Sequence, residues 1–138
     1  MSIVQTQTTS FKKELYQAVH NLSSDTLKIA LYTGNADLNA ATTVYSTTNE
    51  VVASGYTAGG NTLTGVAISS SGYTAYVNWA NTSWTAALTA RCALIYNVTQ
   101  GNKSIAVIDF GADKTSTTTF TITMPANTSI TALIRSSN

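Results

Sequence analysis

The side chains that could catalyse by proton transfer or nucleophilic attack are sparse in this sequence. His20 is the one histidine, and none of the many serines lies in a Gly-x-Ser-x-Gly nucleophile elbow. His20 is near the end of a stretch with helical periodicity, where the helix dipole favours a histidine. We therefore expect His20 to be a C-terminal helix residue rather than a catalytic base.

The carboxylates do not form a convincing pair either. Asp109 and Asp113 lie close together in sequence, and we expect them to flank a turn as solvated, turn-forming side chains. Two carboxylates without further oxygen ligands fall short of a calcium loop. The sequence thus predicts no catalytic residue, no metal site and no cofactor, and we expect the protein not to be an enzyme.

A glycine-rich segment at residues 55–60 lies between two β-prone segments. A phosphate-binding loop would end in Lys-Ser or Lys-Thr and open a helix, and neither feature follows here. We expect a structural turn, with glycine where the backbone needs positive φ or close approach. The single cysteine, Cys92, lies in an apolar alternating segment and is expected to be a small buried side chain.

The aromatic residues permit a second kind of site, because they could stack on a carbohydrate. In a β-sandwich, however, aromatics at alternating positions more often belong to the core. The residues alone therefore favour a binding or structural module. The aromatics in question are Tyr56, Tyr73, Tyr76, Trp79, Trp84 and Tyr96.

The charged fraction of the chain is 9%, against the roughly 25% typical of soluble domains. Thr, Ser and Asn replace the missing charges. A neutral surface can lie against a partner without a large desolvation cost, but Thr is also simply a good strand former, and both interpretations stay open.

The net charge of +1, with no basic run longer than Lys12–Lys13, argues against nucleic acid and anionic membranes as partners. No signal peptide or membrane-spanning run is recognisable, so we expect synthesis in a cytoplasm.

The first part of the chain carries the one helical pattern. Residues 1–9 are polar and are expected to form an extended N-terminal arm, which either dangles or is ordered by a neighbouring subunit. Apolar residues then recur at helical spacing from Phe11 to Leu22, which predicts a helix over 10–22 with Ser10 as its N-cap. Such a short helix needs a sheet to pack against.

The remainder of the chain alternates between strand and turn signals. Seven or eight strands at intervals of roughly ten residues predict a mainly β fold, either a barrel or an antiparallel β-sandwich of jelly-roll or immunoglobulin type. Residues 88–96 are nearly continuously apolar, which indicates a central strand covered on both faces. Residues 10–138 are thus expected to form a single domain. The expected strands are 27–32, 62–68, 73–79, 88–96, 104–110, 120–124 and 129–134, with a short extended piece at 44–47 and a hairpin signal at Gly101–Asn102.

Several segments taken in order carry a family resemblance. They are FKKEL at 11–15, LSSDTLKIALY at 22–32, NEVVASGYTAGG at 49–60, Trp84 followed by TARCALIY at 89–96, IDFG at 108–111 and FTI at 120–122. Together they resemble small structural proteins of tailed-phage virions. Those proteins open with a short helix, continue "D-T-I-K-V-A-L", and carry "N-E-V-x-G-x-G-Y-T-x-G-G" and "W-x…A-R-Y-A-V-I-Y". The chain departs from this pattern at Cys92, where an aromatic is common.

The resemblance implies a non-enzymatic virion component, most often a capsid cement or decoration protein on the outside of the head. Its implied partner is the major capsid protein, its implied state is a homo-oligomer, and its implied location is the capsid surface of a virion assembled in a host cytoplasm. The runner-up hypothesis is a tail- or fibre-associated protein that binds a receptor or glycan through its aromatics. A small hydrolase using His20 or the Asp109/Asp113 pair is the third.

Overall fold

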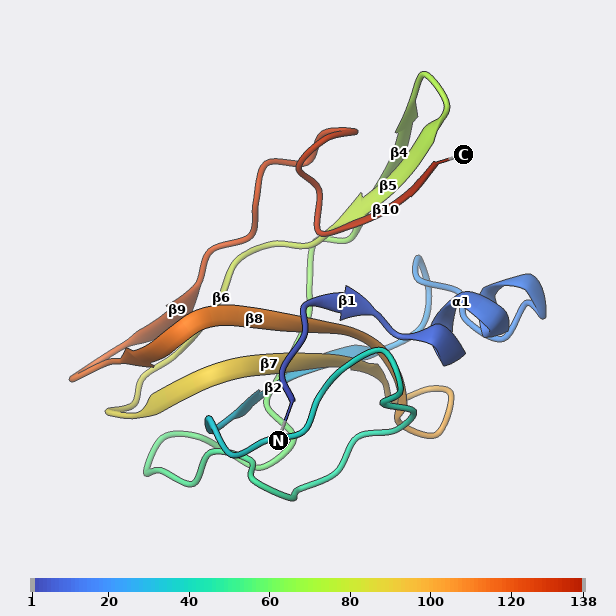
Figure 1. The fold of residues 1–138 in the computed structure, drawn as a ribbon. Coiled ribbons are helices and arrows are strands. Elements are labelled where there is room, and N and C mark those ends of the chain that lie inside the picture. The colour runs from blue at the N-terminus through green and yellow to red at the C-terminus, as the bar shows by residue number, and fades with distance from the viewer. Residues whose placement is uncertain (1, 138) are drawn as a thin grey trace.

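The computed structural model describes residues 2–137. These residues form one short helix and ten strands, so the predicted mainly β, antiparallel fold with a single N-terminal helix is confirmed. Figure 1 shows the arrangement. The elements are β1 (Thr6–Gln7), α1 (Thr9–Tyr16), β2 (Leu27–Tyr32), β3 (Asn61–Thr62), β4 (Ala67–Ser71), β5 (Thr74–Asn78), β6 (Thr82–Trp84), β7 (Thr89–Asn97), β8 (Lys103–Thr115), β9 (Phe120–Ile122) and β10 (Ile134–Ser137).

A five-stranded antiparallel sheet in the order β1-β8-β7-β2-β3 forms the body of the protein. Its centre is β7, which pairs with β2 from Leu27↔Asn97 to Tyr32↔Cys92 and with β8 on its other edge. Every residue from Cys92 to Asn97 is buried, because both faces of the sheet are covered. The prediction of a central strand covered on both faces is therefore confirmed.

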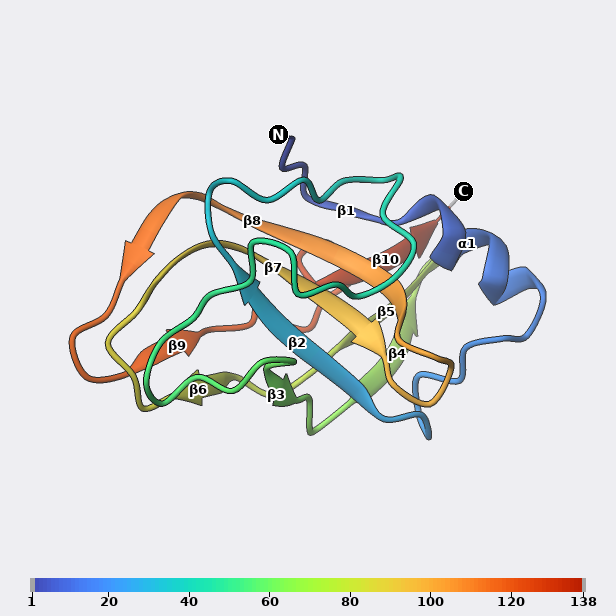
Figure 2. The ribbon, with the colours of Figure 1, turned by 90° about the horizontal axis from the view of Figure 1, so that it is seen from below.

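Two clusters of side chains form the core, one on each face of this sheet. The larger cluster lies between the sheet and the β6–β9 ribbon and includes Ile29, Ile95, Trp84 and Phe120. The smaller one includes Leu94 and lies under the long connection between β2 and β3. Figure 2 shows this connection crossing over the sheet. The packing is that of a sandwich whose second layer is split between the β6–β9 ribbon and another, separate sheet.

That separate sheet has three strands in the order β10-β5-β4 and extends beyond the body (Figure 1). The β4–β5 hairpin is closed by Gly72 and Tyr73, and Gly72 takes φ +58°, as a tight two-residue hairpin requires. The expected single strand at 62–68 is wrong, because Gly65 adopts φ +66° and separates β3 from β4. The last expected strand, 129–134, instead begins at Ile134.

The helix is shorter than the apolar spacing predicted. It starts one residue earlier, with Thr8 rather than Ser10 as the N-cap, and the Thr8 hydroxyl accepts a hydrogen bond from the Phe11 N–H at 3.3 Å. It ends at Tyr16 instead of Leu22, because Ala18 takes the left-handed conformation with φ +58°. The chain then turns back, so the apolar residues after Tyr16 do not continue the apolar face of the helix.

The N-terminal arm is ordered by its own chain. Thr6 and Gln7 pair with Val107 and Ala106 of β8, and Ile3 forms an isolated bridge with Leu38. An extended conformation for residues 2–7 thus agrees with the expectation, while the division of the chain into an arm and a domain at residue 10 stays a prediction.

Candidate functional site

His20 lies beyond the end of α1 and is buried, so its expected place in the last helical turn is wrong. Its Nδ1 is 2.9 Å from the Asn97 side-chain amide nitrogen, which can only donate, and the Nε2–H therefore donates to Glu14 Oε1 at 2.9 Å. The ring also packs at 5.2 Å against Phe11. Both ring nitrogens are thus occupied, and the histidine ties the segment after the helix to the end of β7.

Asp25 completes this network. Its Oδ2 accepts hydrogen bonds from the Asn97 amide at 2.8 Å and from the Asn21 N–H at 3.0 Å. Partial burial by itself raises the pKa of Asp25, but the hydrogen bonds from Asn21 and Asn97 outweigh it and hold the pKa below its ordinary value. The network holds a loop to a strand, and the side chain of its histidine is fully buried.

Asp109 and Asp113 both lie within β8 rather than beside a turn, which corrects the prediction. Asp109 Oδ1 accepts from the Gly111 N–H at 2.8 Å and lies 3.5 Å from Arg91 Nε, an ion pair without hydrogen-bond geometry. Within residues 2–137, no three His, Cys, Asp or Glu side chains gather closely enough to hold a metal ion.

Cys92 is fully buried in β7, as predicted. Burial, with a smaller contribution from the negative charge of Asp109, raises the pKa of the Cys92 thiol to about 12. A thiol in that state is protonated at neutral pH and is neither a nucleophile nor a metal ligand. Cys92 therefore belongs to the core.

A buried carboxylate that the sequence did not single out organises the glycine-rich segment. Glu50 is 6% exposed and accepts hydrogen bonds from the Tyr45 hydroxyl at 2.6 Å, the Tyr56 hydroxyl at 2.5 Å and the Gly59 N–H at 2.8 Å. The Tyr96 hydroxyl donates to the Gly59 carbonyl at 2.6 Å. These five residues, which we call the Glu50 cluster, join the segment to β7.

The tyrosines of this cluster are held neutral. Burial raises the pKa of Tyr96 to about 12, with a further contribution from the charge of Glu50. Burial also raises the pKa values of Tyr45 and Tyr56 well above the ordinary value, and their hydrogen bonds to Glu50 add to this effect. The Tyr45 ring stacks on Tyr96 with centroids 4.5 Å apart. The cluster thus surrounds one carboxylate with neutral hydrogen-bond donors. Its role is to stabilise the fold.

The glycines of the segment have the roles predicted for them. Gly60 has φ +79°, and a Cβ there would lie 1.8 Å from the Ile29 carbonyl oxygen of β2. Gly55 has φ +90°, and its Cβ would lie 2.2 Å from the Thr85 carbonyl oxygen. Both positive φ and close backbone approach are thus required. The segment packs against β2 and against the residue that follows β6, and no helix follows it within residues 2–137, so it offers no helix N-terminus to a phosphate.

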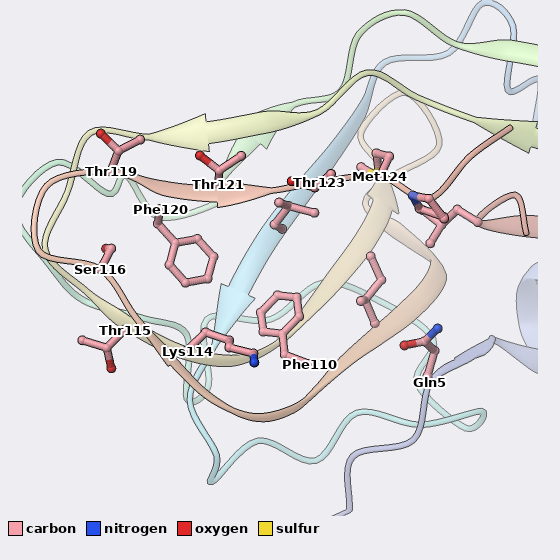
Figure 3. Close-up of a pocket in the computed structure, with 14 residues that line it drawn as sticks. Gln5, Phe110, Lys114, Thr115, Ser116, Thr119, Phe120, Thr121, Thr123 and Met124 are labelled. Carbon is pink, nitrogen blue, oxygen red and sulfur yellow. The ribbon is translucent and has the colours of Figure 1, made fainter.

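A groove of about 630 Å³ lies between the C-terminal half of β8 and the β9 strand (Figure 3). Phe110 and Phe120 point into this space from the two strands, with ring centroids 6.0 Å apart. Its floor is apolar and its rim is neutral apart from Lys114. The floor consists of Ile108, Phe110, Phe120, Ile122, Met124 and Leu133, and the polar rim of Gln5, Lys114, Thr115, Ser116, Thr119, Thr121 and Thr123.

The sequence does not predict the groove, because its aromatic residues lie at alternating strand positions, which are typical of a buried core. β1 pairs only with residues 106 and 107, so within residues 2–137 no strand pairs with that side of β8 beyond Val107. The sandwich is therefore open here, and part of its core is accessible. An accessible apolar floor with a polar rim that carries one charge can bind another protein surface, and the residues that line the groove include no acid–base pair.

The predicted core aromatics divide into two groups. Tyr56, Trp79, Trp84 and Tyr96 are buried, as expected. Tyr76 in β5 is only partly buried, and Tyr73 is the clear exception, since it is 94% exposed at the tip of the β4–β5 hairpin. Tyr16 at the end of α1 is 93% exposed, and the two tyrosines line one shallow hollow together with the polar side chains of Lys12, Gln7 and Arg135.

In the part of the chain that the structure describes, no helix is both long and apolar enough to cross a membrane. Comparison of the chain with protein-family models, with curated proteins and with solved structures found no match in any of the three.

Proposed function

We propose that this protein is a non-enzymatic structural component of a tailed-phage virion, a cement or decoration protein that binds the outside of the major capsid protein lattice and stabilises the head. The observation that carries the proposal is the groove between β8 and β9, which offers an apolar floor and a polar rim with one charged side chain, Lys114, at the open side of the sandwich. The ordered resemblance to small phage structural proteins supplies the identity of the partner.

The way in which the reactive residues are used supports the same proposal. His20, Cys92 and Glu50 are buried and engaged with other parts of the chain, and Lys114 is the one charged side chain among the described residues that line the groove. The segments that carry the resemblance include β2, β7 and the Glu50 cluster, which hold the fold together. The groove, in contrast, is free for a partner.

Rebinding to stripped heads tests this proposal. Heads from which the protein has been removed by mild treatment should rebind the purified protein at saturable stoichiometry and regain resistance to heat or chelation. A variant with an arginine on the rim, Thr121→Arg, should lose most of this binding, because it places a charge at the mouth of an apolar groove. Thr47→Arg, at an exposed position outside the groove, is the matched control.

Both variants must first show the unfolding midpoint of the natural protein. Rebinding of Thr121→Arg at the same stoichiometry as Thr47→Arg would show that the groove is not the contact surface. Recovery of the protein on purified tails, with none on heads, would overturn the cement function itself.

The alternative is a tail- or fibre-associated protein that binds a glycan. The exposed Tyr16 and Tyr73 favour it, because two aromatic faces beside polar side chains are typical of sugar-stacking surfaces. A glycan array with the purified protein tests this function. Binding that Tyr73→Ala abolishes would support it, and an array without binding would contradict it.

A further inference from the structure

β4 is an edge strand of the projecting sheet with one side unpaired. It pairs with β5 along its whole length, from Ala67↔Asn78 to Ser71↔Thr74, and within residues 2–137 nothing pairs with its other side. Hydrogen-bonded and non-hydrogen-bonded pairs alternate in an antiparallel ladder, so every second residue of β4 directs its N–H and C=O outward. All five residues of β4 are exposed.

The other edge of the same sheet is protected. β10 carries Arg135, and the Arg135 carbonyl already accepts a hydrogen bond from the Gln7 side chain at 2.8 Å. Charged residues, prolines and bulges are the usual means by which proteins prevent edge strands from pairing with other chains. β4 has none of these features, because it reads Ala-Ile-Ser-Ser-Ser and keeps an uninterrupted register with β5.

The chemistry of this edge suits a second copy of the same chain. No charged residue occurs between Glu50 and Arg91, so two β4–β5 hairpins can approach without repulsion or the desolvation of a charge. A strand that pairs antiparallel with itself about a two-fold axis satisfies its outward groups reciprocally. Ile68 is 55% exposed and supplies apolar area at the junction.

We infer that two copies of this chain pair antiparallel through β4 and join their three-stranded sheets into one continuous six-stranded sheet. A register centred on Ser69 places Ile68 opposite Ser70 of the second copy. The interface is small, because it comprises one five-residue edge, so dimer formation depends on protein concentration. The inference goes beyond the proposed function and does not rest on it, since the β4 edge is separate from the groove.

Single cysteines test the pairing directly. Directly opposite residues of an antiparallel pair have Cα atoms roughly 4.5–5.5 Å apart, which lies within the range of a disulfide. Ile68→Cys, Ser69→Cys and Ser70→Cys cover registers centred on each of these positions, and Ser136→Cys on β10 is the matched control. The natural Cys92 does not interfere, because it is buried.

At least one of the three β4 cysteines should give a disulfide-linked dimer under mild oxidation, at a rate at least tenfold above that of Ser136→Cys. Equal cross-linking at both edges, or faster cross-linking through β10, would overturn the inference.

Sedimentation of the untagged protein gives a second, reversible test. The natural protein should shift from monomer to dimer as its concentration rises, and Ser70→Lys should remain monomeric, because the register centred on Ser69 places each introduced charge opposite the apolar Ile68 of the second copy. Ser136→Lys should dimerise like the natural protein. A natural protein that stays monomeric throughout, or a Ser70→Lys variant that dimerises equally well, would contradict pairing through β4.

Discussion

The five-stranded body and the projecting three-stranded sheet are built from the same kinds of strand but in opposite environments. In the body, β7 is covered on both faces and is tied to the rest of the chain by the Glu50 cluster. In the projecting sheet, β4 is exposed along its whole length and carries no charge. Burial of this kind yields stability, whereas an exposed neutral edge yields a surface for association. The groove between β8 and β9 lies where the body itself is open.

The sharpest test of this contrast replaces a single glycine of the body. Gly60→Ala should destabilise the protein by more than about 4 kcal/mol or prevent folding, because the added Cβ collides with the Ile29 carbonyl and φ is positive. Gly101→Ala is the matched control. Gly101 has φ +72° but open space around its Cβ, so the cost should be about 1 kcal/mol. Urea unfolding measures both, and equal losses would show that steric contact at Gly60 is unimportant.

A pair of isoleucines compares the two sheets directly. Ile95→Ala in β7 should cost about 3–4 kcal/mol, because the side chain is fully buried. Ile68→Ala in β4 should cost less than about 1 kcal/mol in the monomer, since that side chain is more than half exposed. Denaturation at low protein concentration gives both values. Similar losses at the two positions would mean that the projecting sheet is as tightly packed as the body.

The neutral tyrosines of the Glu50 cluster predict a loss of stability in alkali. The pKa of Tyr96 is raised from 10.0 to about 12 in the folded protein, so the stabilisation is complete below pH 10 and is lost as the pH rises from 10 toward 12. The free energy of unfolding should fall by up to about 1.4 kcal/mol per pH unit for each tyrosine that ionises only in the unfolded chain. Tyr96→Phe should reduce this slope. Urea titrations at pH 8 to 11 measure it, and an unchanged slope would contradict the assignment.

The smallest effect is expected at the tip of the projecting hairpin. Tyr73→Ser should change the free energy of unfolding by less than about 0.5 kcal/mol, because the ring is almost fully exposed. Thermal unfolding provides the measurement, with Tyr56→Phe in the Glu50 cluster as the contrasting variant. A large loss at Tyr73 would indicate that the hairpin contributes to the fold of the monomer.

Local patterns alone determined a large part of this architecture. The strand at Leu27–Tyr32, the central position of the apolar run ending at Tyr96, and the hairpin at Gly101–Asn102 were predicted because alternation and turn chemistry act between near neighbours in the chain. The burial of Cys92 followed from the same alternation. Sequence periodicity reports which residues face a core, and it identified the buried residues of β2 and β7.

Tertiary structure decided the features that depend on distant segments. The partners of Glu50 lie at most nine residues away in the chain, but they converge on it because Tyr56 and Gly59 are themselves held by the distant strands β2 and β7 through Leu31 and Tyr96. The helix ends at Tyr16 because the chain must turn back and bring His20 to Asn97. The groove around Phe110 and the free edge of β4 exist because particular strands lack neighbours, and pairing between strands far apart in sequence is a property of the folded chain alone.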